Sequence, residues 1–420
     1  MQRFNWSDRG TRAAALARPG ARDDSALLEA VRTIVLDVRE RGWEALAGHA
    51  VRIDGAEPKK LTVAPFAEQA RNELPREVRE ALELAARNIE CFHRATTPAD
   101  VEVTPLPGLT VAKRWRPLDR VGLYVPGGKA PLFSTLMMLA LPARVAGVGS
   151  MTVVTPPRPD GGLDLAVALA AERCGVEDIW TVGGAQAIAA LAFGAGDIPR
   201  VDRICGPGNA WVAAAKALVS ALPRGPGIDL PAGPSELMVI ADGSADPEVI
   251  AADLLSQAEH DLDAQVLLVT PAPSLADAVA TCFERQGSGL GAVAPARAIV
   301  CADLEEAVAI ANDYAPEHLS LATAESGRLV PLVRNAGAVF AGHHAAEAFG
   351  DYLAGSSHVL PTDGAARFTG GISTLTFMKA ITVQTVTAPA AAALASPAAA
   401  LARAEGLEAH ARAAEIRSAA

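Results

Sequence analysis

The sequence predicts an α/β protein with two Rossmann-like, doubly wound parallel-sheet domains, a helical N-terminal segment and a small C-terminal helical tail. From residue 120 onward, short apolar segments alternate with helical patterns in two successive series. The apolar segments are continuous, which is typical of strands that are buried on both faces of a parallel sheet. Because parallel neighbours need crossover connections, the segments between them are predicted to be the helices of right-handed βαβ units.

The composition fits a chain of several domains and excludes some classes of protein. The 420 residues are 50% hydrophobic but only 4% aromatic, so the core must consist mainly of Ala, Val, Leu and Ile. The net charge is −11 and no basic cluster stands out, which argues against a nucleic-acid partner. Five scattered cysteines without a CxxC motif indicate a reducing compartment. With no signal core and no stretch suited to a bilayer, we expect a cytoplasmic protein without a membrane partner.

Residues 1–118 are expected to form helices and then a β-hairpin that packs on the main body. Two stretches, 23–46 and 74–95, carry apolar residues at three- and four-residue spacing, which predicts amphipathic helices. Near the end of this region, two extended runs are separated by Pro107-Gly108. This pair predicts the turn of a hairpin.

Two domains are expected to follow, over residues 119–230 and 231–375. The first series of strands is predicted at 121–128, 151–157, 179–184 and 201–206. The second series is predicted at 235–242, 264–270, 296–302 and 336–342. A Pro- and Gly-rich segment, 222–236, lies between the two series and marks the boundary.

Residues 376–420 form the predicted C-terminal tail, which is expected to cross to a partner subunit. Ser396-Pro397 is a typical N-cap and first-residue pair for a final helix. The Ala-rich stretch at 388–395, before this pair, is interpreted as a linker or a disordered segment.

Three glycine-rich turns follow strands of the first series: "VPGGKAPL" with a helix starting at Pro131, "VGGAQAIAAL", and "CGPGNAW". Glycine lets the backbone approach a ligand, and a helix N-terminus favours an anion. None is a Walker A loop or a complete dinucleotide fingerprint, since Ala130 and Trp211 stand at key positions. Each turn alone could be a tight structural loop. Three in one series indicate a nucleotide-sized ligand at the carboxyl ends of the strands.

The stretch "SQAEHD", residues 256–261, places polar side chains at the end of an apolar helix that begins with Asp246-Pro247. Gln257 and His260 are three residues apart and share a helical face. This spacing fits a pair of metal ligands, but it equally fits a solvated helix end.

Two further polar clusters carry candidate chemistry. Glu317 and His318 are adjacent in "PEHL" and could do acid/base work. A second cluster offers His343, His344, Glu347, Asp351 and His358. A metal site is one interpretation of this cluster, and solvated surface histidines are the other.

These motifs together resemble the histidinol dehydrogenase family. The matching stretches lie in the family's order over residues 120–420: "VGLYVPGGKAPLFST", "TVGGAQAIAALAFG", "GPGNAWVAAAK", "DLPAGPSE", "ADLLSQAEHD", "APEHL", "AFGDYLAGSSHVLPT" and "EGLEAHARAAEIR". The family oxidises L-histidinol to L-histidine through an aldehyde in two NAD-dependent steps, the last reaction of histidine biosynthesis. The resemblance implies NAD, one Zn2+ per subunit, L-histidinol as substrate, and a homodimer with shared active sites.

The resemblance also implies a role for particular residues. As zinc ligands it implies Gln257, His260, Asp351 and, from the partner subunit, His410. As the acid/base pair it implies Glu317 and His318. As substrate contacts it implies Ser235, His358 and Glu405, together with the zinc ligands and His318. As NAD contacts it implies Tyr124, Gln186 and Asn209, one in each glycine-turn region.

The residue chemistry agrees with these roles. Gln, His, Asp and His form a nitrogen and oxygen donor set suited to zinc without thiolates. His318 would take the alcohol proton as hydride leaves, since histidine titrates near neutral pH. Glu317 would then activate the water that hydrates the aldehyde.

Other interpretations remain open at this point. A zinc hydrolase would use Glu317 as its base, with structural glycine turns. A bilobal binding protein would explain the fold but not the Glu-His pair, and a related enzyme could act on another amino alcohol. Ser235 lies outside any GxSxG motif, so a hydrolase nucleophile elbow is not expected. Two departures from the family pattern are Trp211, which could alter the cofactor pocket, and Cys205, which could form a thiohemiacetal or simply fill the core.

Overall fold

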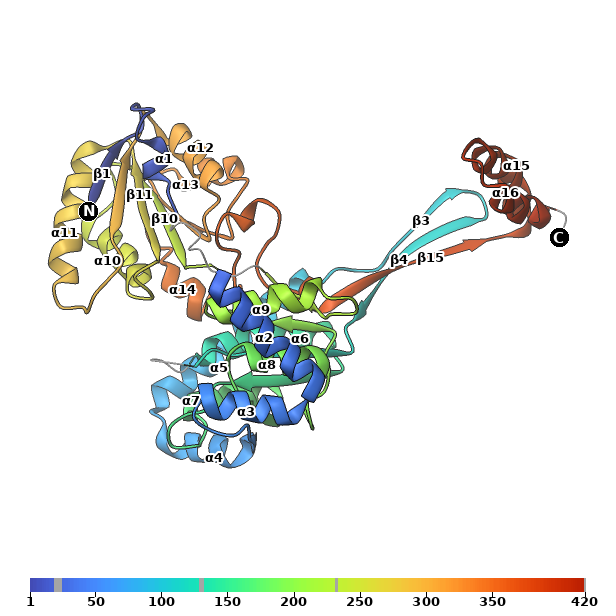
Figure 1. The fold of residues 1–420 in the computed structure, drawn as a ribbon. Coiled ribbons are helices and arrows are strands. Elements are labelled where there is room, and N and C mark those ends of the chain that lie inside the picture. The colour runs from blue at the N-terminus through green and yellow to red at the C-terminus, as the bar shows by residue number, and fades with distance from the viewer. Residues whose placement is uncertain (19–24, 128–131, 231–232, 419–420) are drawn as a thin grey trace.

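The computed structural model describes residues 1–18, 25–127, 132–230 and 233–418. Two α/β domains lie side by side, and a thin arm leads away from them to the C-terminal helices (Figure 1). The predicted fold class is confirmed, because each domain contains a six-stranded, mainly parallel sheet with helices on both faces. Among the described residues, no helix is long and apolar enough to cross a membrane.

The first domain is built on a sheet whose strands spread in both directions from β5. In spatial order the strands are β2 (Lys60–Thr62), β7 (Asp178–Thr181), β6 (Ser150–Thr155), β5 (Arg120–Tyr124), β8 (Arg203–Cys205) and β9 (Gly227–Ile228). The pairs are parallel except for β2 with β7. The strand order reverses between β5 and β8, and such a switch point leaves a crevice beyond the carboxyl ends of the strands.

Helices cover both faces of this sheet, as its continuous apolar strands require. One face packs against α2 (Ser25–Arg41), α3 (Trp43–Ile53), α8 (Gly184–Phe193) and α9 (Ala210–Ala221). The other packs against α4 (Val63–Glu73), α5 (Arg76–Thr96), α6 (Phe133–Ala146) and α7 (Leu165–Cys174). The N-terminal region is thus largely helical, although Lys60–Thr62 is a strand. The helix start expected at Pro131 lies outside the described residues.

The second domain repeats this arrangement and adds the N-terminus to its sheet. In spatial order its parallel strands are β1 (Gln2–Asn5), β12 (Ala296–Val300), β11 (Gln265–Thr270), β10 (Glu236–Ala241), β13 (His318–Ala322) and β14 (Ala338–Ala341). The switch point lies between β10 and β13. The sequence did not predict β1, because so short a strand has no periodic pattern to detect.

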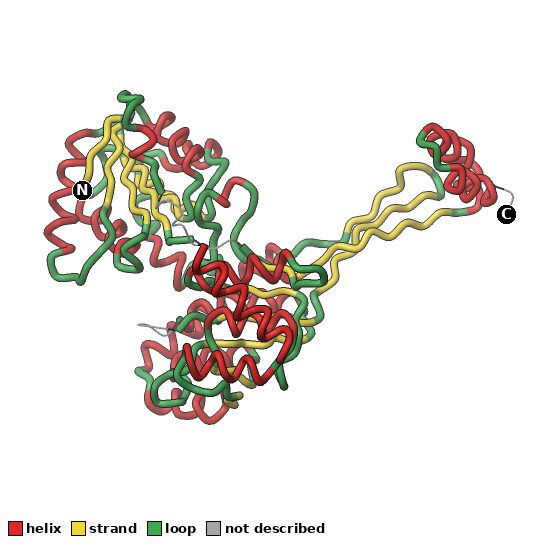
Figure 2. Tube along the Cα trace, viewed as in Figure 1, coloured by secondary structure: helices red, strands yellow, loops and turns green. Residues whose placement is uncertain are grey.

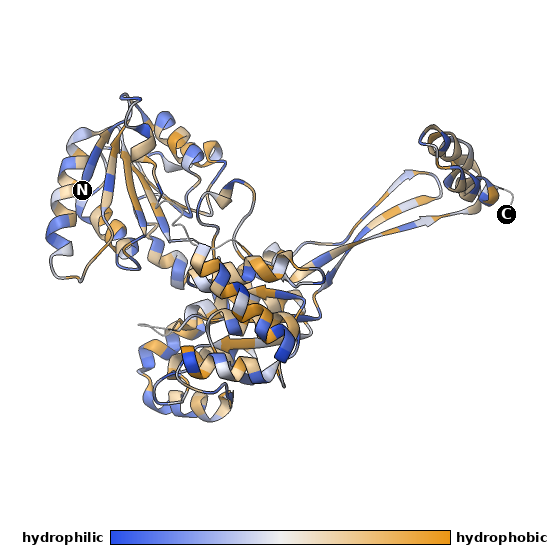
Figure 3. Cartoon of the chain, in the orientation of Figure 1, coloured by the Kyte–Doolittle hydropathy of each residue, from blue (hydrophilic) through white to orange (hydrophobic). Residues whose placement is uncertain are grey.

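Helices also cover both faces of the second sheet. One face packs against α10 (Pro247–Ala258) and α11 (Pro273–Gly287), and the other against α1 (Arg12–Ala15), α12 (Leu304–Tyr314) and α13 (Ser326–Leu329). Helix α10 begins as predicted, since the Asp246 side chain accepts a hydrogen bond from the Glu248 N–H and Pro247 follows it. Figure 3 shows hydrophobic residues along the strands of this sheet. The short helix α14 (Glu347–Tyr352) lies where the two domains meet (Figure 1).

The arm is an antiparallel sheet of β3 (Val101–Leu106), β4 (Leu109–Pro117) and β15 (Met378–Val386). The predicted hairpin and its turn are present, and Gly108 has a φ of +82°, which favours glycine. The hairpin does not pack on the main body as expected, because it pairs with β15 and leads away from the two domains (Figure 1). Much of this sheet is exposed, including the apolar side chains of Val103 and Ile381. Helices α15 (Ala388–Ala404) and α16 (Glu408–Glu415) lie at its far end (Figure 2).

The tail is helical as predicted, but the predicted start of its helix is wrong. Helix α15 begins at Ala388, with Thr387 as its N-cap, and continues through Pro397. Residues 388–395 are therefore helical and are not a linker. Alanine has the highest helix propensity, so this Ala-rich stretch is helical even though an interior proline costs about 3 kcal/mol.

Candidate active site

A cavity of about 830 Å³ between the two domains collects most of the predicted site residues. From the first domain it is lined by Tyr124, Gln186 and Asn209. From the second domain it is lined by Ser235, Gln257, His260, Glu317, His318, Asp351 and His358. The structure therefore brings together residues that are up to about two hundred positions apart in the sequence. Glu405 and His410 are absent from this lining.

The first domain contributes the carboxyl ends of its parallel strands. Tyr124 is the last residue of β5, and its hydroxyl accepts a hydrogen bond from the Gly184 N–H at 3.2 Å. Asn209 follows β8 and caps α9, accepting from the N–H groups of Trp211 and Val212 at 3.1 and 3.2 Å. These N–H groups are already satisfied by side chains. The glycine turns thus shape a wall of the cavity, but the capped N-terminus of α9 is not a bare anion site.

Gln186 lies in the same wall and has one unsatisfied atom. Its Nε2 donates to the Asp54 carboxylate at 3.0 Å, and the same carboxylate accepts the Gly183 N–H at 3.1 Å. The Gln186 Oε1 is buried without a hydrogen-bond partner. A buried carbonyl oxygen without a partner is costly, so this atom is available to a ligand that donates a hydrogen bond. Asp54, which the sequence did not single out, fixes this side chain from the end of α3.

The second domain presents the amino ends of its parallel strands to the cavity. His318 is the first residue of β13, and Glu317 directly precedes it. Ser235 directly precedes β10, and the end of α10 carries Gln257 and His260. The ligand rule for open α/β sheets, which points to the carboxyl ends of strands, therefore holds for the first domain only. This difference follows from how the domains face each other, which no local pattern encodes.

His318 is held in one tautomer by the backbone. Its side chain is buried, and its Nδ1 donates to the Glu236 carbonyl at 3.1 Å. The Nε2 has no hydrogen-bond partner and lies 3.8 Å from Asp351 Oδ1. Burial lowers the pKa of His318 to about 4, so the expectation that it titrates near neutral pH is not met. The ring is neutral at pH 7, and the Nε2 lone pair can accept a proton.

Two buried carboxyl groups flank this histidine. Glu317 Oε2 accepts the Glu236 N–H at 2.9 Å, and Glu347 Oε1 lies 3.6 Å from His318 Nδ1. Burial raises the pKa of Glu317 and of Glu347 well above the ordinary value. Glu347 Oε2 is buried without a partner. Glu347 was left out of the predicted site, although its spacing of four residues from Asp351 on one helix was the available signal.

The end of α10 presents two donor atoms that suit a metal ion. The Gln257 side chain is buried, and its Oε1 has no hydrogen-bond partner. His260 Nδ1 donates to the Ser256 carbonyl at 2.8 Å, which leaves Nε2 free to bind a ligand. The polar end of this helix is therefore more than a solvated terminus, because Gln257 is turned inward.

Asp351 belongs to a cluster of potential metal ligands in the same cavity. Ligand atoms of His318, Glu347 and Asp351 lie within 4.8 Å of one another, so this cluster could hold a metal ion. Next to it, His358 donates from Nδ1 to the Asp351 carbonyl at 3.0 Å and places Nε2 3.1 Å from the Thr135 hydroxyl. Burial lowers the pKa of His358 as well. These two contacts fix the His358 ring before any ligand binds.

Five residues that the sequence raised do not line the cavity: Cys205, His343, His344, Glu405 and His410. Glu405 is the C-cap of α15 and His410 lies on α16. Both are exposed in the helical region at the far end of the arm. In Figure 2 the strands of the arm lie between the C-terminal helices and the two domains. Cys205 is fully buried in the core and does not line the cavity, so it fills space and carries no accessible thiol. His343 is near Ser244, with 3.1 Å between its Nε2 and the hydroxyl, outside the cavity.

The fold and the site define a two-domain α/β protein with a buried, adjacent glutamate and histidine and with candidate metal donors in its interdomain cavity. The model of the histidinol dehydrogenase family matches residues 17–418. The histidinol dehydrogenase of Idiomarina loihiensis is 43% identical over 411 residues, covering 96% of this chain and 93% of that protein. That of Xanthomonas euvesicatoria is 44% identical over 428 residues and 99% of each chain.

A solved structure has the same fold over the whole chain. The crystal structure of histidinol dehydrogenase from Elizabethkingia anophelis matches with a TM-score of 0.93 at 36% identity, covering 99% of this chain and 98% of that one. The chain therefore belongs to the histidinol dehydrogenase family, as the sequence motifs predicted.

Proposed function

We propose that this protein is a histidinol dehydrogenase that oxidises L-histidinol to L-histidine through L-histidinaldehyde, using NAD and zinc, as the last step of histidine biosynthesis. The observation that carries the proposal is the convergence of Glu317, His318 and the donors around Asp351 in one interdomain cavity. The near full-length similarity to proteins named histidinol dehydrogenase supports the same substrate.

The donor set fits a zinc ion. Gln257, His260 and Asp351 would hold it from this chain, and His410 of the partner subunit would complete the set in a homodimer. The unpartnered Gln257 Oε1 supports this assignment, because a buried polar atom without a partner needs a ligand. His260 Nε2 supports it as well, because Nδ1 donates to a backbone carbonyl and leaves Nε2 free to bind a metal. When bound, zinc would act as a Lewis acid that orients the substrate by its nitrogen atoms.

His318 would act as the base for the alcohol. Its neutral ring can accept the hydroxyl proton at Nε2 while a hydride leaves the same carbon for NAD, so that the alcohol loses one proton and one hydride. The Nδ1 contact with the Glu236 carbonyl stabilises the resulting imidazolium. The pKa of about 4 makes His318 a weak base, but one whose ring is neutral and able to accept a proton at pH 7.

Glu317 would act in the second oxidation. As a carboxylate it would take a proton from the water that adds to the aldehyde, and a second hydride would then leave for NAD. Its raised pKa makes it a stronger base than an exposed glutamate once it is ionised. The closed environment of this buried pair helps to keep the aldehyde away from bulk water.

The remaining predicted residues would bind and orient the reactants. Ser235 and His358 line the cavity beside the candidate metal donors and are proposed substrate contacts, joined by Glu405 of the partner subunit. Tyr124, Gln186 and Asn209 line the opposite wall and are proposed NAD contacts. We further propose the domain limits 1–118, 119–230, 231–375 and 376–420, with residues 2–5 completing the second sheet.

A single assay tests the proposal. Purified protein is mixed with L-histidinol and NAD, and NADH is followed by absorbance while histidine is quantified by chromatography. We expect two NADH for each histidine, and loss of the reaction on treatment with a chelator that zinc reverses. A metal-replete protein that forms no NADH, or that hydrolyses histidine esters instead, contradicts the proposal and favours a zinc hydrolase.

A further inference from the structure

Glu236 connects the N-terminal segment to the proposed acid/base pair. It is the first residue of β10 and is almost fully buried. Its backbone N–H donates to Glu317 Oε2 at 2.9 Å, and its carbonyl accepts from His318 Nδ1 at 3.1 Å. Its own side chain accepts the Glu317 N–H at 3.3 Å through Oε2. One residue thus contacts the side chains of both proposed catalytic residues and the backbone of one of them.

Arg18 holds the Glu236 carboxylate from the other side. Its Nε and Nη2 donate to the two carboxylate oxygens at 2.5 and 3.0 Å, which is a bidentate pair. The guanidinium also donates to the Tyr314 carbonyl at 2.9 Å and lies 3.8 Å from the centre of the Tyr314 ring. The Asp363 N–H donates to the same carboxylate at 3.2 Å. The position of Glu236 is therefore fixed from three separate segments.

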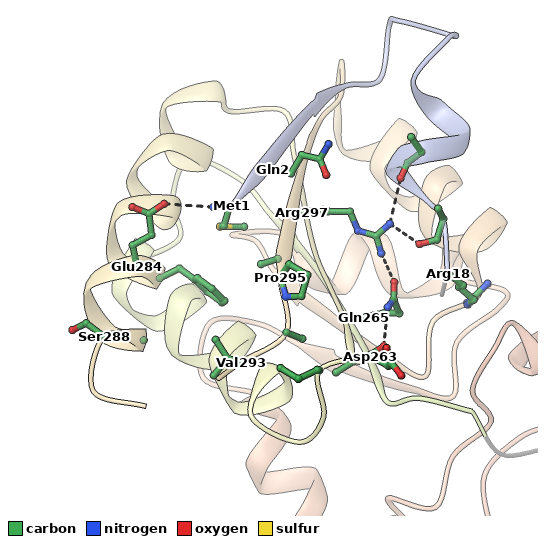
Figure 4. Close-up of a pocket in the computed structure, with 18 residues that line it drawn as sticks. Met1, Gln2, Arg18, Asp263, Gln265, Glu284, Ser288, Val293, Pro295 and Arg297 are labelled. Carbon is green, nitrogen blue, oxygen red and sulfur yellow. Dashed lines mark hydrogen bonds and ion pairs between the residues drawn. The ribbon is translucent and has the colours of Figure 1, made fainter. Parts of the chain in front are cut away.

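A second arginine secures the segment that carries Arg18. Arg297 donates to the carbonyls of Ala15 and Ala17 at 3.0 and 2.6 Å. It also pairs with the Gln265 side chain, as Figure 4 shows. Together with the pairing of β1 and β12, these bonds anchor residues 1–18 to the second sheet. The N-terminal strand, which is remote in sequence from the cavity, is thereby coupled to it.

We propose that Glu236, held by Arg18, is a positioning residue that fixes the tautomer of His318 and the orientation of the Glu317 carboxyl group. Neither residue touches the reactants in this arrangement, since the Glu236 side chain faces away toward Arg18. The inference rests on the proposed function only for its kinetic consequence. The tautomer of His318 can be measured without turnover.

The first test replaces Arg18 by Met in the full-length protein and uses Arg12→Met as the matched control. Arg12 lies in the same segment, 4.6 Å from the Trp6 ring centre, and donates to the Trp6 carbonyl at 2.7 Å, with no contact to the site. We expect Arg18→Met to lower kcat roughly 10- to 100-fold with little change in KM or zinc content, because misplaced catalytic groups slow the chemical step. Arg12→Met should keep the kcat of the parent.

Rescue and coupling sharpen this test. Arg18→Lys keeps the charge but loses the bidentate geometry, so its kcat should lie between that of Arg18→Met and that of the parent protein. Arg18→Met leaves the buried Glu236 carboxylate without its cation and can fail to fold, so the double variant Arg18→Met/Glu236→Gln, which removes both charges, is tested beside it. Its kcat should match that of Arg18→Met alone, since the pair acts as one unit. A parental kcat in folded Arg18→Met and Arg18→Lys overturns the proposal, as does an equal loss in Arg12→Met.

The second measurement is independent of turnover. Nitrogen NMR of the His318 imidazole, assigned with His318→Gln, should show the Nδ1–H tautomer in the parent protein and a mixture in Arg18→Met. The same tautomer in both proteins overturns the positioning role. If the parent and Arg18→Met differ in the His318 tautomer but the parent does not reduce NAD with histidinol, the proposed function is contradicted. The positioning role is then still supported.

Discussion

In the cavity between the two domains, the predicted acid/base residues are buried and hydrogen-bonded, whereas Glu405 and His410, in the C-terminal helices beyond the arm, are exposed and do not line that cavity. His318 and Glu317 are only 4% and 5% exposed, and the Glu236 backbone holds both. The difference shows that one part of the proposed site is organised by the fold of a single chain. In the proposed homodimer, the other part comes from a second copy of the chain.

The largest expected effect comes from the buried half of the site. His318→Gln should lower kcat by roughly 10²- to 10⁴-fold, the usual contribution of a general base, because glutamine cannot take the alcohol proton. Zinc content, measured by atomic absorption, should not change, since His318 is not among the proposed zinc ligands. Near-normal turnover by this variant would remove His318 from the mechanism.

The next effect tests whether the arm completes the site of another subunit. His410→Asn should weaken zinc binding roughly 10- to 100-fold and lower activity with it, since a ligand is lost. When His410→Asn and His318→Gln subunits are mixed under conditions of subunit exchange, a mixed dimer regains one intact site if the arm crosses.

This mixing experiment distinguishes the two architectures directly. Each parental variant, taken through the same exchange alone, is the control and should keep its own low activity. If activity does not return although mixed dimers are detected by mass spectrometry, each site is built within one chain.

A smaller expected effect is a pH-dependent loss of stability in the buried body, which the exposed arm should not share. His93 on α5 is fully buried, its ring nitrogens have no hydrogen-bond partner, and burial lowers its pKa to about 4. The unfolded chain, with its ordinary histidine pKa of about 6.5, binds this proton more readily. The contribution of neutral His93 to the free energy of unfolding is therefore fully present above a pH of about 6.5 and is lost as the pH falls toward 4.

Between pH 7 and pH 5 this one histidine should cost about 2 kcal/mol of unfolding free energy. His93→Leu should lose less stability than the parent over the same interval, as measured by urea unfolding of chelator-treated protein. Other titrating groups cancel in this comparison. Equal losses in the two proteins would mean that His93 titrates normally in the fold.

The smallest expected effect concerns helix α15, at the far end of the arm. Pro397→Ala should stabilise α15 by about 1 kcal/mol, because it restores an interior hydrogen bond, offset in part by a more flexible unfolded chain. Hydrogen exchange in α15 should slow while exchange in α8 and α10 stays the same. A change that spreads into the two domains would show that the arm and the body unfold together.

Much of the fold could be predicted from the sequence because its signals are local. Continuous apolar strands, the Asp246-Pro247 helix start and the turn at Gly108 each depend on neighbouring residues, and each was correctly predicted. The start of α15 was wrong because Ser396-Pro397 is also tolerated inside an Ala-rich helix. Strand β1 escaped notice because it is too short for a periodic pattern.

The candidate site was predicted less completely for a related reason. Motifs identified Gln257, His260 and Asp351 as possible ligands, but only the structure shows that the Gln257 side chain is turned inward with a free oxygen. The pKa of His318 depends on burial, which a local pattern does not report. Glu347 has the right spacing from Asp351, but only its burial distinguishes it from the exposed acidic residues of the chain.

The sequence by itself determined the two parallel-sheet domains, the hairpin and the family, because hydrophobic periodicity, turn chemistry and ordered motifs are properties of contiguous residues. Only the tertiary structure decided that the carboxyl ends of one sheet face the amino ends of the other, and that Arg18 reaches Glu236 across more than two hundred residues. It also decided that Glu405 and His410 stand apart on the arm. These features depend on how buried surfaces pack against one another, and packing is set by the whole chain at once.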